Sequence, residues 1–353
     1  MKKRILSICA VLCMALVAMA EGKAKYVFYF IGDGMGVNQV NGTETYLAAL
    51  EGRIGTSPLC FAQFPYAGLV TTFSASNGIT DSAAGGTALA TGHKTKNGAL
   101  GVKADLTTPV RSVAAAAQAD GKAVGIATSV SIDHATPASF YAHVKDRGMY
   151  HQIGKDLITA GFDFYAGSDF LEPENRELSG EQTLYEQCEK AGYTIARGYT
   201  DYQQKEEKAD KMLLLQTEAA SQKDRTSIPY AIDRQKDDLT LRDITRAAID
   251  FLSQKDKDGF FLMVEGGKID WGCHSNDAAT VFQEVIDLDE AVKVAYEFYR
   301  QHPEETLILI TADHETGGIA LGAGSTELHF DLLKNQRQSA ETFSRTIAAQ
   351  HQG

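Results

Sequence analysis

The chain has 353 residues, of which 44% are hydrophobic and 23% are charged, and this is the composition of an ordinary globular protein rather than a disordered or fibrous one. The formal net charge of -12 argues against nucleic acid as a partner, because affinity for nucleic acid comes mostly from Lys and Arg side chains that neutralise phosphates. An acidic protein that acts on an anion must supply positive charge locally, and divalent cations bound by carboxylate and imidazole groups do this.

Residues 1–20 have the pattern of a secretory signal peptide. A basic start at residues 2–4 precedes an apolar stretch over residues 5–19, and Ala18-Met19-Ala20 is a suitable cleavage site. The alternative is a membrane anchor, which needs about 20 apolar residues and stronger flanks. We therefore expect cleavage after Ala20, export to the periplasm or the cell exterior, and a mature chain without a membrane span.

Strand-like apolar runs alternate with helical stretches along the rest of the chain. The runs at 26–31, 123–128, 260–265 and 306–311 predict buried strands, and the apolar spacing within 110–119, 239–253 and 278–300 predicts helices. This alternation is typical of an α/β fold with a mostly parallel central sheet and helices on both faces. The more polar segment 171–226 is expected to decorate the sheet rather than to form a separate domain.

Each predicted strand ends directly in polar or ionisable residues. Asp33 follows the first strand in a glycine-rich turn, Ser129 follows the second, Glu265 ends the third, and Asp313-His314 follows the fourth. Open α/β sheets bind ligands at the carboxyl ends of their strands. Four such strand ends therefore predict one composite site.

Two carboxylate–imidazole pairs indicate metal binding. Asp313 adjoins His314, and Asp270 is followed four residues later by His274. Each pair alone could be a salt bridge or a cap, and Asp33 alone could cap its own turn. Asp and His are usual zinc ligands, and the presence of both pairs at strand ends favours a metal site.

The segment 80–88 predicts a loop that enters a helix of small residues ending near Gly92. Ser82 would lie at the N-terminus of this helix, where free amides and the helix dipole attract phosphate and favour an alkoxide. From this segment alone, a Ser that only caps the helix is an equally good interpretation. Arg147 has a guanidinium fork that suits two phosphate oxygens, although a solvated surface position is its default interpretation.

Three cysteines, Cys60, Cys188 and Cys273, follow the predicted signal peptide. Export would allow a Cys60–Cys188 disulfide, and three free or buried thiols are an equally good interpretation.

Several separated motifs resemble those of the alkaline phosphatase family in order and spacing. They are Asp81-Ser82-Ala83-Ala84, His134-Ala135-Thr136-Pro137-Ala138 leading to Arg147, Val264-Glu265-Gly266 leading to Asp270, and Thr311-Ala312-Asp313-His314-Glu315-Thr316-Gly317-Gly318. The resemblance extends from about Tyr26 to about Gly318. It implies one domain of this family over residues 21–353, with small phosphate monoesters as substrates and a homodimer as the assembly.

The resemblance also implies residue roles. Ser82 would be the nucleophile that becomes phosphorylated, and Arg147 would bind the non-bridging phosphate oxygens. One zinc ion would be bound beside Ser82, and a second would be bound by Asp270 and His274 on the leaving-group side. The implied ligands of the first zinc are Asp33, Asp313 and His314.

A magnesium ion is implied beside the zinc ions, bound by Asp33, Thr136 and Glu265. Two positions near it vary within the family, and this chain has His134 and Trp271 there, where other members have a carboxylate or a basic residue. Because both positions lie near the magnesium or the phosphate, we expect them to affect metal preference and the pace of product release.

The resemblance ends after Gly318. Family members carry a third imidazole for the leaving-group zinc in a His-Thr-Gly context, whereas only His329 and His351 follow Gly318 here, in other contexts. We therefore expect a domain that is incomplete at its C-terminus and has one weakened zinc site. A phosphate-binding or metal-binding protein without turnover is the alternative. A related phosphodiesterase, sulfatase or mutase is disfavoured by the Asp-Ser-Ala-Ala loop.

Overall fold

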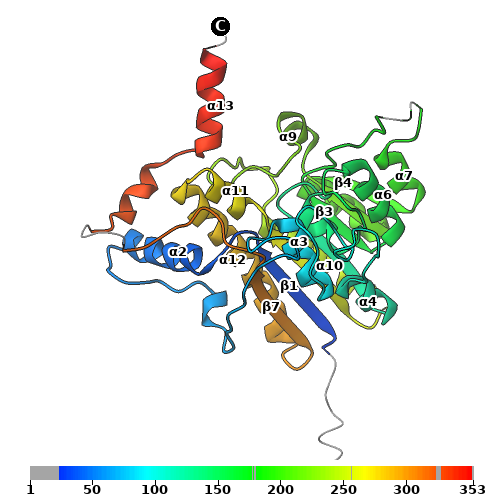
Figure 1. The fold of residues 1–353 in the computed structure, drawn as a ribbon, viewed down its shortest axis with the longest axis horizontal. Helices are drawn as coiled ribbons and strands as arrows, with labels where there is room; N and C mark the ends of the chain where they lie inside the picture. Colours follow the sequence, from blue (N-terminus) through cyan, green and yellow to red (C-terminus); the bar gives the residue numbers. More distant parts are fainter. Residues whose placement is uncertain (1–23, 177, 179, 256, 323–326, 352–353) are drawn as a thin grey trace, which may run out of the picture.

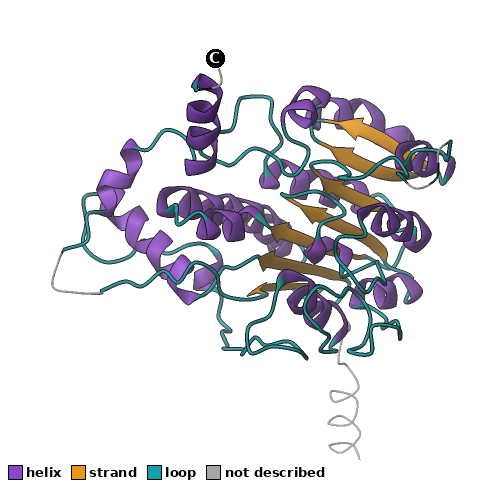
Figure 2. Ribbon diagram, turned by 45° about the horizontal axis from the view of Figure 1, so that its top comes forward, coloured by secondary structure: helices purple, strands orange, loops and turns teal. Residues whose placement is uncertain are grey.

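The computed structural model describes residues 24–176, 178, 180–255, 257–322 and 327–351 (Figure 1). The predicted signal peptide, residues 1–20, lies outside this part of the chain. The described strands form one seven-stranded sheet in the order β4-β5-β3-β2-β6-β1-β7, and their pairings are parallel. Helices cover both faces of this layer (Figure 2). The predicted α/β fold is confirmed.

The four predicted strands are present with their starts as predicted. The seven strands of the sheet are β1 Tyr26–Gly32, β2 Ala123–Thr128, β3 Phe164–Gly167, β4 Tyr193–Arg197, β5 Lys211–Leu215, β6 Phe260–Gly266 and β7 Thr306–Ala312. The sequence did not reveal β3, β4 or β5, which are four or five residues long. Because β4 and β5 lie within residues 171–226, the prediction that this segment only decorates the sheet is wrong: it supplies two of the strands.

The helices alternate with the strands along the chain. The longer ones are α2 Val37–Leu50, α3 Ser82–Thr91, α6 Tyr150–Ala160, α10 Leu241–Ser253, α12 Ala278–Gln301 and α13 Ala340–Gln350. The shorter ones are α4 Val113–Ala119, α5 Ala135–Ala138, α7 Leu184–Lys190, α8 Tyr199–Lys205, α9 Glu218–Lys223 and α11 Lys268–His274, with 3-10 turns η1 Phe61–Gln63, η2 Glu206–Lys208 and η3 Phe330–Asn335.

Side-chain caps fix where the predicted helices begin. The hydroxyl of Ser112 accepts a hydrogen bond from the Ala115 amide at 3.1 Å, so α4 begins at Val113 rather than at residue 110. Thr240 caps α10 in the same way, at 2.9 Å from the Asp243 amide. Each cap satisfies an amide that the first turn of a helix leaves without a partner.

One hydrophobic core lies on each face of the sheet. Alternate residues of a strand point to opposite faces. In β6, Phe260 belongs to the core beneath α2, α10 and α12, whereas Phe261 belongs to the core beneath α3, α4 and α6. All seven residues of β6 are buried, which explains why its sequence is apolar without alternation.

The register of the central strands aligns their carboxyl ends. Gly32 of β1 pairs with Gly266 of β6 and with Ala312 of β7. The residues that follow β1 and β7 therefore emerge at the same edge of the sheet, beside the end of β6.

None of the described helices is long and apolar enough to cross a membrane. The thiols of Cys60, Cys188 and Cys273 are free in this structure.

Candidate active site

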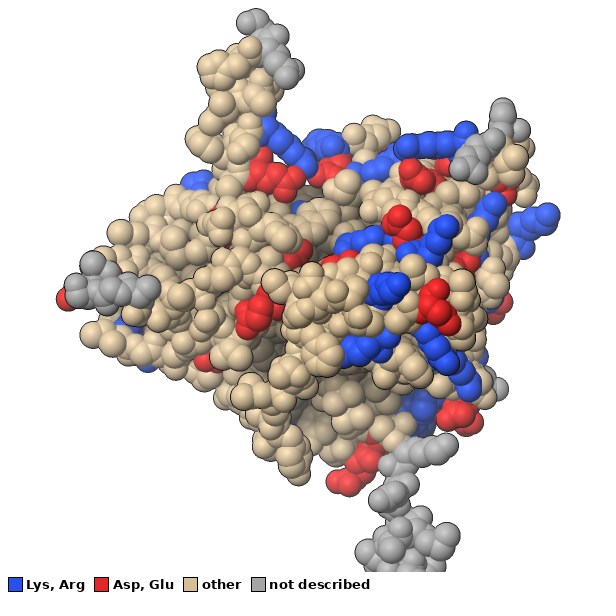
Figure 3. Space-filling model, viewed as in Figure 1, with Lys and Arg blue, Asp and Glu red and all other residues tan. Residues whose placement is uncertain are grey.

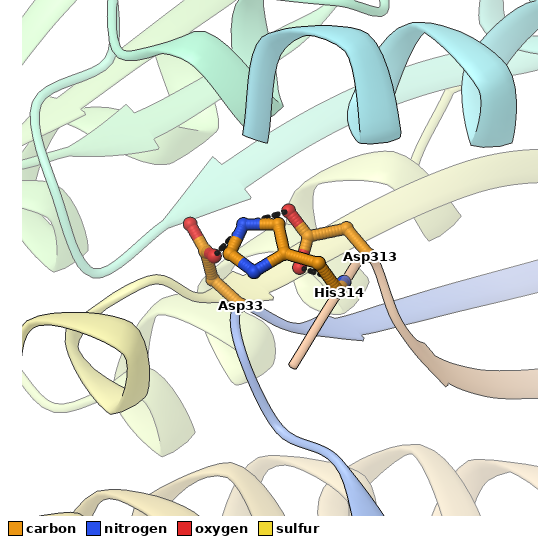
Figure 4. Close-up of side chains that lie close together, drawn as sticks. All are labelled: Asp33, Asp313 and His314. Atoms are coloured by element: carbon orange, nitrogen blue, oxygen red, sulfur yellow. Dashed lines mark hydrogen bonds and ion pairs between the residues drawn. The ribbon is translucent and has the colours of Figure 1, made fainter. Parts of the chain in front are cut away.

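The predicted composite site forms at the carboxyl edge of the sheet. Asp33 comes from the end of β1, and Asp313 and His314 come from the chain leaving β7, so that the three side chains converge (Figure 4). One carboxylate oxygen of each aspartate and one ring nitrogen of the histidine all lie within 4.8 Å of one another. Among the described residues, this is the group of three metal-type donors that lie close enough together to hold one ion.

The contacts orient His314 toward the carboxylates. Its Nδ1 lies 3.0 Å from the Glu315 carbonyl oxygen, which can only accept a hydrogen bond, so a proton on Nδ1 satisfies this contact. In that tautomer Nε2 carries the lone pair, at 3.2 Å from Asp33 Oδ1 and 3.5 Å from Asp313 Oδ2. An imidazole held in this tautomer can serve as a metal ligand through Nε2.

The carboxyl groups of the site are buried, and several of their oxygens lack a hydrogen-bond partner among the described residues. Burial raises the pKa of Asp33, and the nearby charge of Asp313 raises it further, while burial raises the pKa of Glu265 to about 7. Asp33 Oδ1, Asp313 Oδ2 and Glu265 Oε1 are buried and receive no hydrogen bond from the described residues. Acceptors of this kind, gathered in one place, suit a bound divalent cation, which would stabilise the ionised carboxylates.

Ser82 is the first residue of α3. The N-cap is Asp81, whose Oδ1 accepts a hydrogen bond from the Ala84 amide at 3.0 Å, so the interpretation of Ser82 as a simple cap is wrong. The Ser82 side chain is nearly buried and its Oγ lies 3.3 Å from His314 Nε2. Gly92, in the left-handed region at φ 73°, ends the helix where the sequence predicted.

Glycine allows α3 to approach the metal-type cluster. A Cβ atom on Gly85 would lie 3.0 Å from the Asp313 carbonyl oxygen, and one on Gly86 would lie 2.6 Å from Ser139 Oγ. The two glycines of the helix therefore permit the close packing that places Ser82 beside His314.

Arg147 is held at the mouth of this site from two sides. Its Nη1 donates to Asp81 Oδ2 at 3.3 Å, and its Nη2 lies 3.3 Å from His134 Nε2. Burial is the main cause that lowers the pKa of His134 to about 3, and the positive charge of Arg147 adds to it. This imidazole is therefore neutral and can accept a hydrogen bond from the guanidinium. Sequence reasoning did not single out Asp81, although its position before Ser82 was visible.

The second predicted pair lies on α11. His274 Nε2 is 3.4 Å from Asp270 Oδ2, as expected for residues one helical turn apart. Asp270 is buried, whereas the His274 side chain is 72% exposed. Thr316 donates a hydrogen bond to Asp270 Oδ1 at 2.6 Å. The sequence analysis assigned no role to Thr316.

The predicted magnesium ligands lie behind the metal-type cluster. Thr136, at the start of α5, is 3.5 Å from Asp33 Oδ2 through its hydroxyl, and Glu265 is fully buried. Thr128 at the end of β2 also donates a hydrogen bond to Glu265. No local pattern marked Thr128, because its partner is 137 residues away.

The remaining predicted residues line one cavity of about 520 Å³ with the site. The Trp271 ring packs edge-on to the His134 ring, with centroids 5.7 Å apart. The lining residues include Ser82, Arg147, Asp270, His274 and His314, and do not include His329 or His351, which are both exposed.

The comparisons with known proteins point to one family. The family model described as alkaline phosphatase matches residues 24–163 and 164–351. Alkaline phosphatase 3 of Bacillus subtilis is 34% identical over 333 residues, covering 93% of this chain and 69% of that protein. Alkaline phosphatase 4 of the same organism is 36% identical over 284 residues, covering 76% of this chain and 57% of that protein.

The solved structures agree with the sequence relatives. Alkaline phosphatase from Thermus thermophilus superposes with a TM-score of 0.80 at 30% identity, covering 92% of this chain and 67% of that chain. The enzyme from the Antarctic bacterium TAB5 superposes with a TM-score of 0.72 at 33% identity, covering 84% and 80% of the two chains. The chain belongs to the alkaline phosphatase family.

Proposed function

We propose that the protein hydrolyses small phosphate monoesters by transferring the phosphoryl group first to Ser82 and then to water. The observation that carries this proposal is the position of Ser82 Oγ: at the N-terminus of α3, 3.3 Å from His314 Nε2, in the cavity that Arg147 also lines. Family membership supports the same reaction class.

The donor set fits metal ions. Asp33, Asp313 and His314 would hold one zinc ion, and Asp270 with His274 would hold a second. Asp33, Thr136 and Glu265 offer only oxygen atoms, which suits magnesium. When bound, such ions stabilise negative charge on the attacking and leaving oxygens. A solved mutant of the TAB5 enzyme, with a histidine replaced by glutamate, contains magnesium in its M3 site.

In the first step, Ser82 Oγ attacks the phosphorus in line with the leaving oxygen and releases its proton to solvent. The phosphorus–oxygen bond to the leaving group breaks as the seryl phosphate forms, and the departing alkoxide takes up a proton from solvent. Arg147, fixed by Asp81 and His134, donates to the non-bridging phosphate oxygens. The free amides and the dipole of α3 favour the negative charge that accumulates there.

In the second step, water attacks the phosphorus of phosphoserine. The bond from phosphorus to Ser82 Oγ breaks, inorganic phosphate leaves, and the hydroxyl is restored. Positioning and charge stabilisation are sufficient for phosphoryl transfer, because its loose transition state spreads charge over three oxygens.

A phosphate-binding or metal-binding protein without turnover is the second candidate. It is favoured by the Asp270–His274 pair, which offers only two protein donors and exposes His274 to solvent. Turnover of a chromogenic phosphate monoester, measured with zinc and magnesium supplied, distinguishes the two candidates.

The test of the nucleophile is Ser82→Ala, with Ser344→Ala on α13 as a control. Acid quenching during turnover should trap phosphoserine on the peptide that contains Ser82, as detected by mass spectrometry. Ser82→Ala should reduce kcat by about 1,000-fold or more, because the remaining groups retain only residual catalysis. Unchanged turnover in Ser82→Ala, or phosphate trapped on another residue, would refute the assignment.

We also propose that the protein functions as a homodimer, as the family resemblance implies.

We propose further that the protein is exported after cleavage near Glu21. The basic and apolar pattern of residues 1–20 supports export. Amino-terminal sequencing of the exported protein should begin near Glu21, and a retained Met1 would contradict the cleavage.

A further inference from the structure

One hydroxyl group joins the two halves of the proposed metal centre. Thr316 Oγ1 donates to Asp270 Oδ1 at 2.6 Å and lies 3.1 Å from His314 Nδ1. Asp270 lies on α11, 46 residues before Thr316 in the sequence, whereas His314 lies in the same loop as Thr316, after β7. Thr316 therefore contacts one donor of each proposed zinc site.

The directions of these hydrogen bonds are determined by their partners. The Thr316 hydroxyl is the donor to Asp270 Oδ1, so its proton points to that carboxyl oxygen. The same hydroxyl oxygen can then only accept from His314, whose Nδ1 proton is shared with the Glu315 carbonyl at 3.0 Å. Because the proton is on Nδ1, the Nε2 lone pair faces Asp33 and Ser82. Thr316 thus orients Asp270 and gives the His314 Nδ1 proton a second acceptor.

Two glycines allow the backbone around Thr316 to pack closely against neighbouring segments. A Cβ atom on Gly34, which has φ 65°, would lie 2.7 Å from Thr316 Oγ1, so a glycine is needed for the hydroxyl to approach. Gly317, with φ 75°, would place a Cβ 2.6 Å from the Cys273 carbonyl of α11. The Thr316 loop therefore lies in direct contact with α11.

A buried amide holds the same loop from α2. Gln39 Nε2 donates to the Thr316 carbonyl at 2.7 Å and lies 3.6 Å from Cys273 Sγ. Gln39 is fully buried. The backbone of Thr316 is thus held by a contact that does not involve its side chain. The hydroxyl remains available for hydrogen bonds with Asp270 and His314.

We propose that Thr316 is a positioning residue that sets the orientation of Asp270 and His314, and hence the relation between the two proposed zinc sites. This inference rests on the proposed function, because it assigns metal binding to both side chains. Partners that orient metal ligands commonly change metal affinity by about 10- to 100-fold when they are removed.

The experiment is a cobalt(II) titration of the purified, metal-free protein, followed by visible absorption, which reports ligand geometry as well as affinity. Thr316→Val removes the hydroxyl at similar volume, and Thr316→Ser retains it. Thr280→Val is the matched control, because the buried Thr280 hydroxyl in the first turn of α12 donates to Oδ2 of the N-cap residue Asp277 at 2.6 Å. Melting temperatures of the metal-free variants show whether folding is affected equally.

Thr316→Val should weaken cobalt binding by about 10- to 100-fold and change the absorption spectrum. Thr316→Ser and Thr280→Val should bind as the wild type does. If Thr316→Val binds both ions with wild-type affinity and spectrum, or if Thr280→Val weakens binding as much, Thr316 has no positioning role. If the wild type binds no cobalt, both the proposed metal centre and the positioning role of Thr316 are refuted. If the wild type binds metal and turns over but Thr316→Val behaves like it, only the positioning role of Thr316 is refuted.

Discussion

At the scale of single residues, Arg147 depends on two neighbours for its position. Asp81 Oδ2 accepts from Arg147 and also from the Gly98 amide at 3.0 Å, while its other oxygen caps α3. One aspartate therefore links the helix that carries the nucleophile to the cation that would bind phosphate. The neutral His134 ring holds the other side of the guanidinium.

Replacing Arg147 with Ala should weaken phosphate binding and turnover together. The guanidinium would make two charge-assisted hydrogen bonds that strengthen as charge accumulates on the phosphate oxygens, so we expect kcat/KM to fall by about 100-fold or more. Steady-state kinetics and the inhibition constant of inorganic phosphate measure this. Arg111→Ala, an exposed arginine before α4, is the control. An unchanged inhibition constant in Arg147→Ala would remove Arg147 from the phosphate site.

At the scale of elements, we expect α11 to offer a weaker metal site than the loop ends of β1 and β7. Catalytic zinc sites usually have three protein ligands, and Asp33, Asp313 and His314 meet this number, whereas α11 provides Asp270 and His274 alone. After dialysis against metal-free buffer, elemental analysis should find about one zinc per chain. His274→Ala should leave this value unchanged. Two zinc ions retained per wild-type chain would show that the α11 site has a further ligand.

The long helix α12 contains a buried carboxyl group whose charge costs stability. Burial, and then the charge of Asp287, raise the pKa of Glu284 to about 7, although Arg234 and Lys268 partly oppose this. The folded pKa lies above the ordinary value of 4.5. The stability that the protonated form contributes is therefore fully present below about pH 4.5 and is lost as the pH rises through about 7.

Glu284→Gln should remove this pH dependence. The amide keeps an oxygen that can accept from the Ala231 backbone at the position where Glu284 Oε1 accepts at 2.7 Å. Between pH 5 and pH 8, the free energy of unfolding of the wild type should fall relative to that of Glu284→Gln by about 1–3 kcal/mol. Chemical denaturation at both pH values measures the difference. Glu290→Gln, at a half-exposed position of α12 where the carboxylate pairs with Arg242 and Lys293, should show no such change.

At the scale of the whole molecule, charge and exposure are unevenly distributed. In the view of Figure 3, acidic and basic side chains gather on the right, while the left is mostly uncharged. Strand β7 lies at one edge of the sheet and pairs with β1 alone among the described strands. Its seven residues, Thr306–Ala312, include no charged residue, and the side chains of Leu307 and Leu309 are 42% and 43% exposed. An apolar, uncharged edge strand is a template for pairing with another chain.

We expect this chain, in isolation, to self-associate through β7 as its concentration rises. Leu307→Lys should reduce the association, because a charge on an edge strand opposes strand pairing. Sedimentation velocity over a range of concentrations measures the effect. Val113→Lys on α4, where the native side chain is 41% exposed, adds the same charge elsewhere. Equal behaviour of the two variants would show that β7 is not the contact.

The sequence by itself determined the strands that form long apolar runs. Strands β1, β2, β6 and β7 are such runs, six or seven residues long, and each ends at the polar residues of the site. In β2 and β6 every residue is buried, because helices cover both faces of the central sheet. The motif order also determined the family. The strands β3, β4 and β5 were not predicted, because in a run of four or five residues the hydrophobic periodicity cannot distinguish a strand from a helix.

Only the tertiary structure decided which side chains serve which partners. The segment 80–88 taken alone left a cap and a phosphate-site role equally good interpretations of Ser82, and the fold assigned the cap to Asp81. The contacts of Arg147 with Asp81 and of Thr316 with Asp270 join residues 66 and 46 positions apart. Such contacts depend on strand order and register, which bring distant segments to one edge of the sheet, and no local pattern of residues encodes them.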